Sequence, residues 1–228
     1  MATVLITGAN RGIGLGLAAR FLSAGWRVIA CCRAPERATA LRALAPHPEL
    51  TIHVLDVTSG ESIDALVAAL GTTTLDVLIN NAGINPAKPA SAADLDYDAW
   101  REALEVNAIA PFRISVALRA CLQRSSRPRV ITISSQMGSF AKNSAGSVAY
   151  RTSKSAANKA MQLLALEFQS DKIVVCPVHP GWVQTDMGGV GAEISVAESA
   201  DGLFSLIDRV TMKESGRFFT WDGREHPW

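Results

Sequence analysis

The sequence lacks a charge excess and a long apolar run, and each absence excludes a class of protein. Its 22 basic and 21 acidic side chains give a formal net charge of +1 and are interspersed along the chain. We therefore expect neither a nucleic-acid partner nor attachment to an anionic membrane. No apolar run reaches membrane-spanning length, and the first apolar stretch begins at Thr3 with no leader-like segment before it, so we expect no membrane insertion.

Cysteine is scarce, and its placement argues against a zinc site. The four cysteines lack the paired spacing of a metal centre, and the two adjacent ones pair poorly with each other: Cys31, Cys32, Cys121 and Cys176. His179 has no partner acid or nucleophile in register, which favours a structural role. We expect no metal site and a reducing, cytoplasmic location.

Short β-rich apolar runs alternate with longer helical patterns along the whole chain. We expect strands near Val4–Thr7, Arg27–Cys32, Thr51–Leu55, Val77–Asn80, Arg129–Ser134, Ile173–Val178 and Gly216–Thr220. We expect helices over Gly12–Ser23, Pro35–Leu44, Ser62–Leu70, Tyr97–Cys121, Val148–Phe168 and Val196–Val210. This rhythm predicts an α/β fold: a single doubly wound (Rossmann) domain over residues 1–228, with a parallel seven-stranded sheet and helices on both faces.

A glycine-rich segment, TGANRGIG at residues 7–14, follows the first predicted strand and opens the first predicted helix. Its glycines allow a tight turn and a close approach of the backbone to a pyrophosphate at the helix N-terminus. Such a cluster alone is often just a turn, but the strand before it and the helix after it favour dinucleotide binding. The predicted cofactor-binding residues here are Gly8, Asn10, Arg11, Gly12, Ile13 and Gly14.

The end of the second predicted strand favours NADPH/NADP+ over NADH as the cofactor. Chains that bind NAD usually place a carboxylate there to hold the ribose hydroxyls, whereas this chain has Arg33. A guanidinium can bind a ribose phosphate bidentately, and Arg11 adds a second positive charge. Two alternatives are that Arg33 is a solvated surface charge and that Glu36 is the ribose ligand.

Tyr150 and Lys154 lie one turn apart on a predicted helix, so the ammonium can favour the phenolate electrostatically. An unperturbed tyrosine has a pKa near ~10, which is too high for efficient proton exchange at neutral pH. This spacing alone is common on solvated helix faces. Here a predicted strand ending in Ser134 and Ser135 precedes the helix and delivers hydroxyls to the ligand-binding edge of the sheet.

The glycine spacing of residues 7–14, the Tyr150–Lys154 pair and the strand-end serines resemble the short-chain dehydrogenase/reductase family over essentially the whole chain. The resemblance implies a catalytic set of Asn107, Ser135, Tyr150 and Lys154. It implies further cofactor contacts at Asp56, Val57, Asn81, Ala82, Gly83, Tyr150, Lys154, Pro180, Gly181, Val183 and Thr185. In this reading Asp56 and Val57 border the adenine, Lys154 holds the nicotinamide ribose, and the segment from Pro180 covers the nicotinamide.

Several of these positions have structural alternatives. Asp56 can cap a helix, and Asn80 can serve the sheet rather than the ligand. Ser134 can be a strand-end hydrogen-bonding residue beside Ser135. Asn107 can be a packed helix residue, whereas the family resemblance implies a backbone carbonyl displaced from regular helix pairing that holds a water for Lys154.

The short glycine-rich stretch between Met187 and Val196 predicts an open substrate pocket. Together with the aromatic run Gly216–Trp228 and the motifs at Tyr150 and Pro180, it resembles the C-factor and sniffer-type carbonyl reductases. That resemblance implies a carbonyl substrate of modest size, such as an aldehyde, ketone, dicarbonyl or quinone.

The resulting hypothesis is an NADPH-dependent oxidoreductase that reduces a small-molecule carbonyl, with Ser135 donating a hydrogen bond and Tyr150 supplying the proton. One alternative is a dinucleotide-binding signalling or sensor protein with little turnover, a role that has been proposed for relatives of C-factor. Another is NAD-dependent oxidation of an alcohol. The long predicted helices leave both a monomer and a homodimer open.

Overall fold

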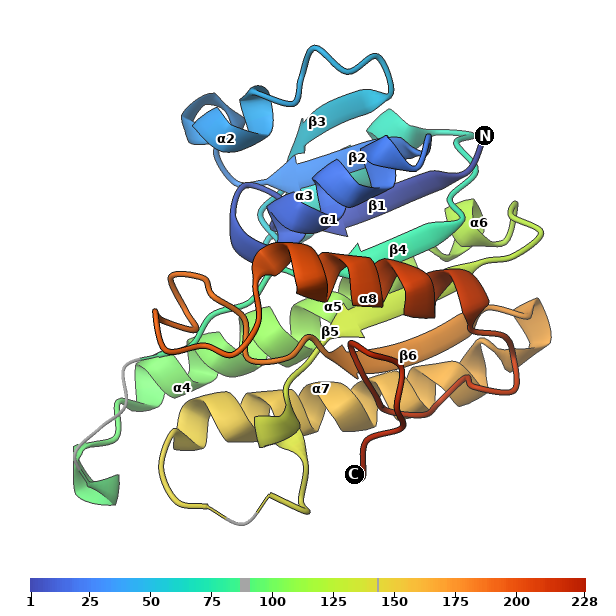
Figure 1. The fold of residues 1–228 in the computed structure, drawn as a ribbon. Coiled ribbons are helices and arrows are strands. Elements are labelled where there is room, and N and C mark those ends of the chain that lie inside the picture. The colour runs from blue at the N-terminus through green and yellow to red at the C-terminus, as the bar shows by residue number, and fades with distance from the viewer. Residues whose placement is uncertain (87–90, 143) are drawn as a thin grey trace.

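A computed structural model of the chain describes residues 1–86, 91–142 and 144–228, and the strands in these ranges form one parallel sheet (Figure 1). The strands are β1 Thr3–Thr7, β2 Arg27–Cys32, β3 Leu50–Val54, β4 Val77–Asn80, β5 Arg129–Ile133, β6 Val174–His179 and β7 Phe219–Thr220. Their order is β3-β2-β1-β4-β5-β6-β7, so the chain reverses its direction of winding between β1 and β4. That switch point opens a crevice at the carboxyl ends of the strands.

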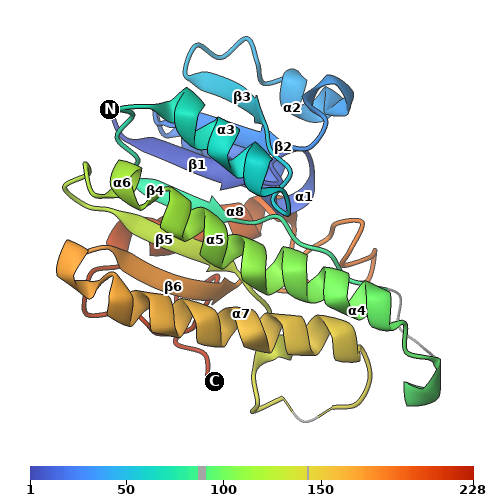
Figure 2. The same ribbon diagram turned by 180° about the vertical axis from the view of Figure 1, so that it is seen from behind.

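Helices cover both faces of this sheet. On one face lie α1 Gly12–Ser23, α2 Thr39–Arg42 and α8 Val196–Arg209 (Figure 1). On the other lie α3 Gly60–Leu70, α4 Tyr97–Leu104, α5 Ala110–Ala117, α6 Arg119–Leu122 and α7 Val148–Glu167 (Figure 2). Short helical segments complete the path: η1 Pro35–Arg37, η2 Ala92–Asp94, η3 Glu105–Ile109, η4 Gln136–Gly138 and η5 Gln169–Asp171. The predicted doubly wound fold is confirmed.

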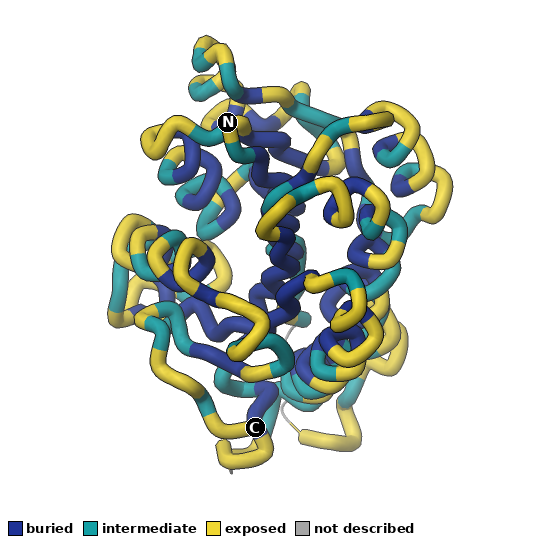
Figure 3. Tube along the Cα trace, turned by 90° about the vertical axis from the view of Figure 1, so that its right-hand side faces the viewer, coloured by how far each residue is buried: buried dark blue, intermediate teal, exposed yellow. Residues whose placement is uncertain are grey.

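The strands are apolar throughout because both of their faces are covered. All five residues of β1 are buried, and the buried strands form the centre of the molecule in Figure 3. Side chains alternate along a strand, so Leu5 packs into the core beneath α3, α5 and α7, whereas Ile6 packs beneath α1 and α8. Two hydrophobic cores, one on each face, fix the sheet that carries the site.

One predicted helix is not continuous in the structure. The expected run Tyr97–Cys121 is interrupted by η3, a π-helical turn at Glu105–Ile109, and it ends in two short helices. Pro111 supplies a reason, because proline has no backbone N–H and cannot donate to the carbonyl four residues earlier. That carbonyl belongs to Asn107, which therefore lies where α-helical pairing is broken.

Two further elements differ from the prediction by more than two residues. The helix expected over Pro35–Leu44 splits into η1 and α2 because Ala38, between them, has a non-helical ψ of 64°. The strand expected at Gly216–Thr220 shrinks to two residues. Gly216 has a φ of 81° and therefore turns the chain before β7 begins.

Candidate active site

A cavity of about 1270 Å³ opens at the carboxyl edge of the sheet, where the crevice at the switch point lies. Most of the predicted site residues line it: Gly8, Asn10, Arg11, Gly12, Ile13, Arg33, Asp56, Val57, Asn81, Ala82, Gly83, Ser135, Tyr150, Lys154, Pro180, Gly181, Val183 and Thr185. Gly14 and Asn107 do not line it. The cavity thus brings residues from across the whole chain to one place.

The glycine-rich turn leaves the N-terminus of α1 open to a ligand. Gly8 and Gly12 have φ values of 64° and 53°, a conformation that favours glycine. The helix has no side-chain cap and no acidic residue in its first turn. Its first amides and the positive end of its dipole are therefore available to an anion such as a pyrophosphate. These residues fit a dinucleotide.

Gly14, which was predicted to contact the cofactor, instead allows close packing between the helix and the turn. A Cβ placed there would lie 2.4 Å from Asn81 Nδ2 and 2.4 Å from Gly8 O. The Asn81 amide donates to Thr7 O at 2.9 Å and to Gly8 O at 3.0 Å, which ties the end of β4 to the turn. The third glycine is needed because the helix, the turn and Asn81 meet here without space for a side chain.

At the other end of the cofactor region, two guanidinium groups line the cavity. One is Arg33, as predicted, and the other is Arg37 in η1. The sequence reading missed Arg37 because it expected an uninterrupted helix there. Glu36, the alternative ribose ligand, is not a lining residue, and its carboxylate lies 3.8 Å from the Arg37 guanidinium. The geometry therefore favours a positive pocket for a ribose phosphate.

Two strand-end residues have clear local roles. Asp56 lines the cavity, and its Oδ1 accepts hydrogen bonds from the backbone N–H and the hydroxyl of Thr58, which lower the pKa of the Asp56 carboxyl. Ser59, and not Asp56, caps α3. Asn80 is buried and donates to Ser115 Oγ at 3.0 Å, which supports the structural alternative for this residue.

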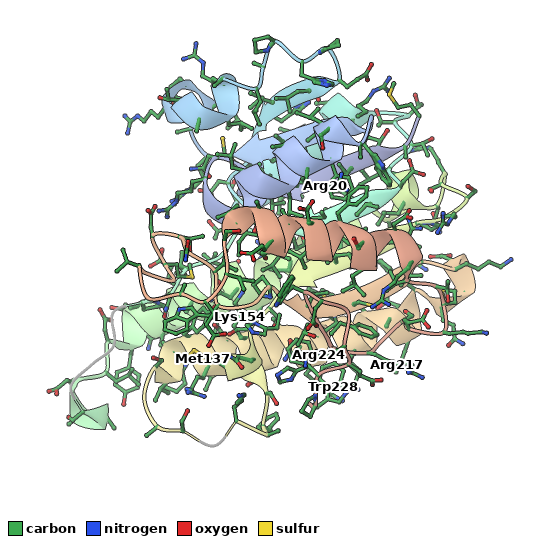
Figure 4. All side chains as sticks on the ribbon, viewed as in Figure 1. Arg20, Met137, Lys154, Arg217, Arg224 and Trp228 are labelled. Carbon is green, nitrogen blue, oxygen red and sulfur yellow. The ribbon has the colours of Figure 1, made fainter. Side chains whose placement is uncertain are left out.

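Tyr150 and Lys154 lie on the first two turns of α7, and both line the cavity. Figure 4 labels Lys154 near Met137. Lys154 is 4% exposed, and its Nζ donates to Ile133 O at 2.8 Å. Burial lowers the pKa of this ammonium from 10.5 to about 8. Its Nζ lies 5.8 Å from the centre of the Tyr150 ring. The lysine therefore keeps two of its N–H donors for other partners.

The environment of Tyr150 differs from the expectation. Burial raises the pKa of the phenol, and the neighbouring Ser135 hydroxyl acts in the opposite direction. We expected the lysine to lower this pKa, but burial has the larger effect because it penalises the phenolate. Tyr150 is therefore held as the protonated phenol, the form that can donate a proton.

The two serines at the end of β5 are directed to different partners. Ser134 donates to the buried amide oxygen of Asn158 at 2.5 Å, so its hydroxyl has a structural partner. Ser135 is the N-cap of η4, and its Oγ accepts a hydrogen bond from Met137 N at 3.1 Å. The hydrogen of the Ser135 hydroxyl can therefore be donated to the neighbouring Tyr150 oxygen or to a ligand, and both residues line the cavity.

Asn107 is held beside the site by its side chain. Its amide donates to Ile84 O at 2.8 Å and to Ser153 Oγ at 2.9 Å, and its oxygen accepts from Ile84 N at 2.9 Å. The side chain is thus fully engaged in holding the segment after β4 against α7. Only the backbone carbonyl, which Pro111 deprives of its α-helical donor, is left for another partner.

The segment after β6 crosses to the glycine-rich turn. Ser199 in α8 donates to Pro180 O at 2.6 Å, and a methyl carbon of Thr185 lies 3.3 Å from a Cβ built on Gly12. Arg11 Nη1 and Asp186 Oδ2 form an ion pair at 2.5 Å. This segment therefore closes one side of the cavity and touches the turn that faces it.

Other lining residues were not among the predicted site residues. Gln136, Met137, Trp182 and Met187 also line the cavity. His179 also lines the cavity, and burial together with His226 and Lys142 lowers its pKa to about 4. Its imidazole is therefore neutral at physiological pH. These positions lie in loops or at a strand end, where only the tertiary structure shows that they meet.

Neither a metal cluster nor a membrane span is found in the described ranges. No group of three or more His, Cys, Asp or Glu residues there could hold a metal ion. No helix there is both long and apolar enough to cross a bilayer.

Comparison with known proteins places this fold and site in a family. A family model described as short chain dehydrogenase matches residues 2–193. The chain belongs to the short-chain dehydrogenase/reductase family of oxidoreductases, as the motifs predicted. It is similar to C-signal of Myxococcus xanthus, with 39% identity over 158 residues that cover 69% of this chain and 95% of C-signal.

Two solved structures are similar over the full length. Carbonyl reductase Sniffer of D. melanogaster has a TM-score of 0.94 and 33% identity, and the match covers 100% of both chains. The NADPH-bound carbonyl reductase from chicken fatty liver has a TM-score of 0.94 and 34% identity, with 100% of this chain and 99% of that chain covered. The predicted likeness to sniffer-type carbonyl reductases is thereby confirmed.

Proposed function

We propose that this protein is an NADPH-dependent carbonyl reductase in which Tyr150 is the general acid. One observation carries the proposal: Tyr150, Ser135 and Lys154 face the same cavity as the open N-terminus of α1 and the guanidinium groups of Arg33 and Arg37. A proton donor, a hydrogen-bond donor and a dinucleotide-binding turn therefore share one space.

The roles follow from the charge that a carbonyl oxygen gains when its carbon is reduced. The dinucleotide, when bound, supplies the hydride. Ser135 donates its hydroxyl hydrogen to that oxygen, and Tyr150 donates the proton, because burial keeps its phenol protonated. The substrate is an aldehyde, ketone or quinone that enters between Met137, Trp182 and Met187.

Lys154 is suited to binding and to proton supply. A pKa of about 8 lies close to neutral pH, so the group can both hold and release a proton. Two N–H donors remain after its bond to Ile133 O, and we assign them to the ribose beside the nicotinamide and to a water. The backbone carbonyl of Asn107 would hold that water, so that Tyr150 can be reprotonated from solvent.

The choice of NADPH depends on charge. Arg11, Arg33 and Arg37 all line the cavity, and Arg33 and Arg37 follow β2, so a ribose phosphate there would meet guanidinium groups. The chicken carbonyl reductase of similar structure binds NADPH. A chain suited to NAD would instead have a carboxylate near the end of β2.

The direct test is the consumption of NADPH and of NADH by the purified protein with a panel of aldehydes, ketones and quinones. We expect turnover with NADPH and its loss in Tyr150→Phe, which keeps the ring but removes the proton donor. The matched control is Tyr97→Phe, which changes the chain's other tyrosine, 61% exposed on α4, and should leave turnover intact. Equal turnover by Tyr150→Phe and wild type would contradict the assignment.

A second candidate function is a dinucleotide-binding signal with little turnover, and the similarity to C-signal favours it. In that case Tyr150→Phe would keep both NADPH binding and biological activity. Running the panel in reverse, with alcohols and NAD+ or NADP+, tests the third candidate, alcohol oxidation. Turnover that is faster with NAD+ and alcohols than with NADPH and carbonyls would favour it.

A further inference from the structure

Ser135 owes its orientation to a short turn. The residue is the N-cap of η4, its Oγ accepts from Met137 N at 3.1 Å, and its carbonyl accepts from Gly138 N at 2.9 Å. A turn of three residues has too few internal hydrogen bonds to fix a hydroxyl by itself. What holds the two ends of this turn therefore decides where the Ser135 hydroxyl points.

Both ends are held by side chains of α7 that lie beyond Lys154. Before the turn, Ser134 Oγ donates to Asn158 Oδ1 at 2.5 Å, and both residues are 2% exposed. After the turn, Gly138 O accepts from Ser155 Oγ at 2.9 Å and from Asn158 Nδ2 at 3.4 Å. The amide of Asn158 is thus bonded on both sides of Ser135.

The turn also rests directly on the backbone of the helix. A Cβ on Gly138 would lie 2.7 Å from the carbonyl carbon of Lys154. No side chain separates the turn from α7 at that point, so a shift of the turn is a shift relative to Lys154 and Tyr150. One helix therefore carries two of the proposed catalytic groups and also holds the third.

We propose that Asn158, with Ser134, is a positioning residue that fixes Ser135 against Tyr150 and Lys154. Neither Asn158 nor Ser155 lines the cavity, whereas Ser134 does line it but commits its hydroxyl hydrogen to Asn158 Oδ1. Asparagine suits the position because its amide accepts from Ser134 and donates to Gly138 O while adding no charge one turn from the buried Lys154. This inference rests on the proposed carbonyl reduction.

Asn158→Leu removes both hydrogen bonds at nearly constant volume, and Ser134→Ala removes one of them with a smaller change. We expect Asn158→Leu to lower kcat about 10- to 100-fold, because small misplacements of catalytic groups are costly. NADPH affinity should stay within about twofold, since the glycine-rich turn and the arginines are untouched. Thr132→Val is the matched control, because its hydroxyl is equally buried in β5 but bonds to Met161 and not to the turn.

A double-mutant cycle separates positioning from general destabilisation. If Asn158 acts through Ser135, adding Asn158→Leu to Ser135→Ala should lower kcat no further. Ser134→Ala should behave in the same way with a smaller effect, and it serves if Asn158→Leu does not fold. Multiplicative losses in the double mutant, or a loss of kcat equal to that of Thr132→Val, would overturn the proposal.

Amide hydrogen exchange gives a readout that does not need turnover. The N–H groups of Met137 and Gly138 both bond to Ser135, so their exchange should be at least about tenfold faster in Asn158→Leu and unchanged in Thr132→Val. A wild-type protein without carbonyl reduction would refute the proposed function alone. Unchanged exchange at these two amides in Asn158→Leu would refute the positioning role.

Discussion

The two ends of the cavity are built on different principles. At the proposed cofactor end, the cavity is shaped by backbone conformation and missing side chains, as at Gly8 and Gly12, and is lined by exposed arginines. At the proposed chemical end, the cavity is lined and supported by buried polar side chains, among them Lys154, Asn107 and Asn158. Burying polar or charged groups costs free energy unless every hydrogen bond is satisfied. The cofactor end therefore depends mainly on the shape of the backbone, whereas the chemical end depends on buried polar groups whose desolvation lowers the free energy of unfolding.

The largest expected effect is at the chemical end, in Lys154→Met. Turnover should fall about 10²- to 10⁴-fold, because the proposed proton supply is lost. The apo protein at pH 7 should nevertheless become more stable, by up to about 3 kcal/mol, since a buried ammonium with a depressed pKa opposes folding. Scanning calorimetry and NADPH turnover on the same preparation measure both.

The difference in stability between Lys154→Met and the wild type should shrink as the pH rises. The folded pKa of Lys154, about 8, lies below its ordinary value of 10.5, so the unfolded chain binds more protons between these values. The stability of the wild type should rise relative to Lys154→Met as the pH goes from 8 to 10.5. Lys159→Met, an exposed change on the same helix, should show no such trend. A constant gap across this range would mean that Lys154 is not titrating abnormally.

At the cofactor end, Gly14→Ala should act by overpacking. The new methyl group would meet Asn81 and the Gly8 carbonyl at 2.4 Å, and one of these is backbone that cannot swing away. We expect a loss of about 1–3 kcal/mol in stability and weaker NADPH binding, because the turn must move. Gly60→Ala, with no atom within 4 Å of the new methyl group, is the control. Wild-type NADPH affinity in Gly14→Ala would show that the turn tolerates displacement.

The same contrast explains what the sequence could predict. The cofactor end is encoded in short contiguous motifs, so the turn at residues 7–14 and Arg33 were placed from local pattern alone. The hydrogen bonds that hold the chemical end in place join residues far apart in the sequence, such as Asn107 with Ile84 and Asn158 with Ser134. No local sequence pattern predicts them. The broken helix at Asn107 is different, because the family resemblance implies it, and Pro111, which lacks a backbone N–H, gives it a local physical reason.

Arg33→Ser should have a smaller effect that is confined to one cofactor. Losing a charge-assisted hydrogen bond to a phosphate should weaken NADPH binding about tenfold and leave NADH binding nearly unchanged. Arg42→Ser is the control, because this exposed arginine is near η1 but does not line the cavity. Equal losses for both cofactors would place Arg33 near the adenine rather than the ribose phosphate. Titration with both dinucleotides at constant salt decides between these outcomes.

The smallest effect is expected at the ion pair that bridges the cavity near the cofactor end. Arg11 and Asp186 are 68% and 78% exposed, so their pairing contributes little to stability. The carboxylate nevertheless neutralises one of the guanidinium groups assigned to the ribose phosphate. Asp186→Asn should therefore tighten NADPH binding about two- to threefold at low salt and leave NADH binding unchanged.

Measuring NADPH affinity at several salt concentrations separates a charge effect of Arg11 from a movement of the segment after β6. If the gain comes from the freed charge of Arg11, it should shrink as ionic strength rises, because exposed charges are screened within about 8 Å at physiological salt. Asp201→Asn breaks the comparable pair with Arg20, which does not line the cavity, and should change neither cofactor affinity. A gain that persists at high salt would instead indicate that the segment after β6 has moved, which would make the cofactor end as dependent on side-chain contacts as the chemical end.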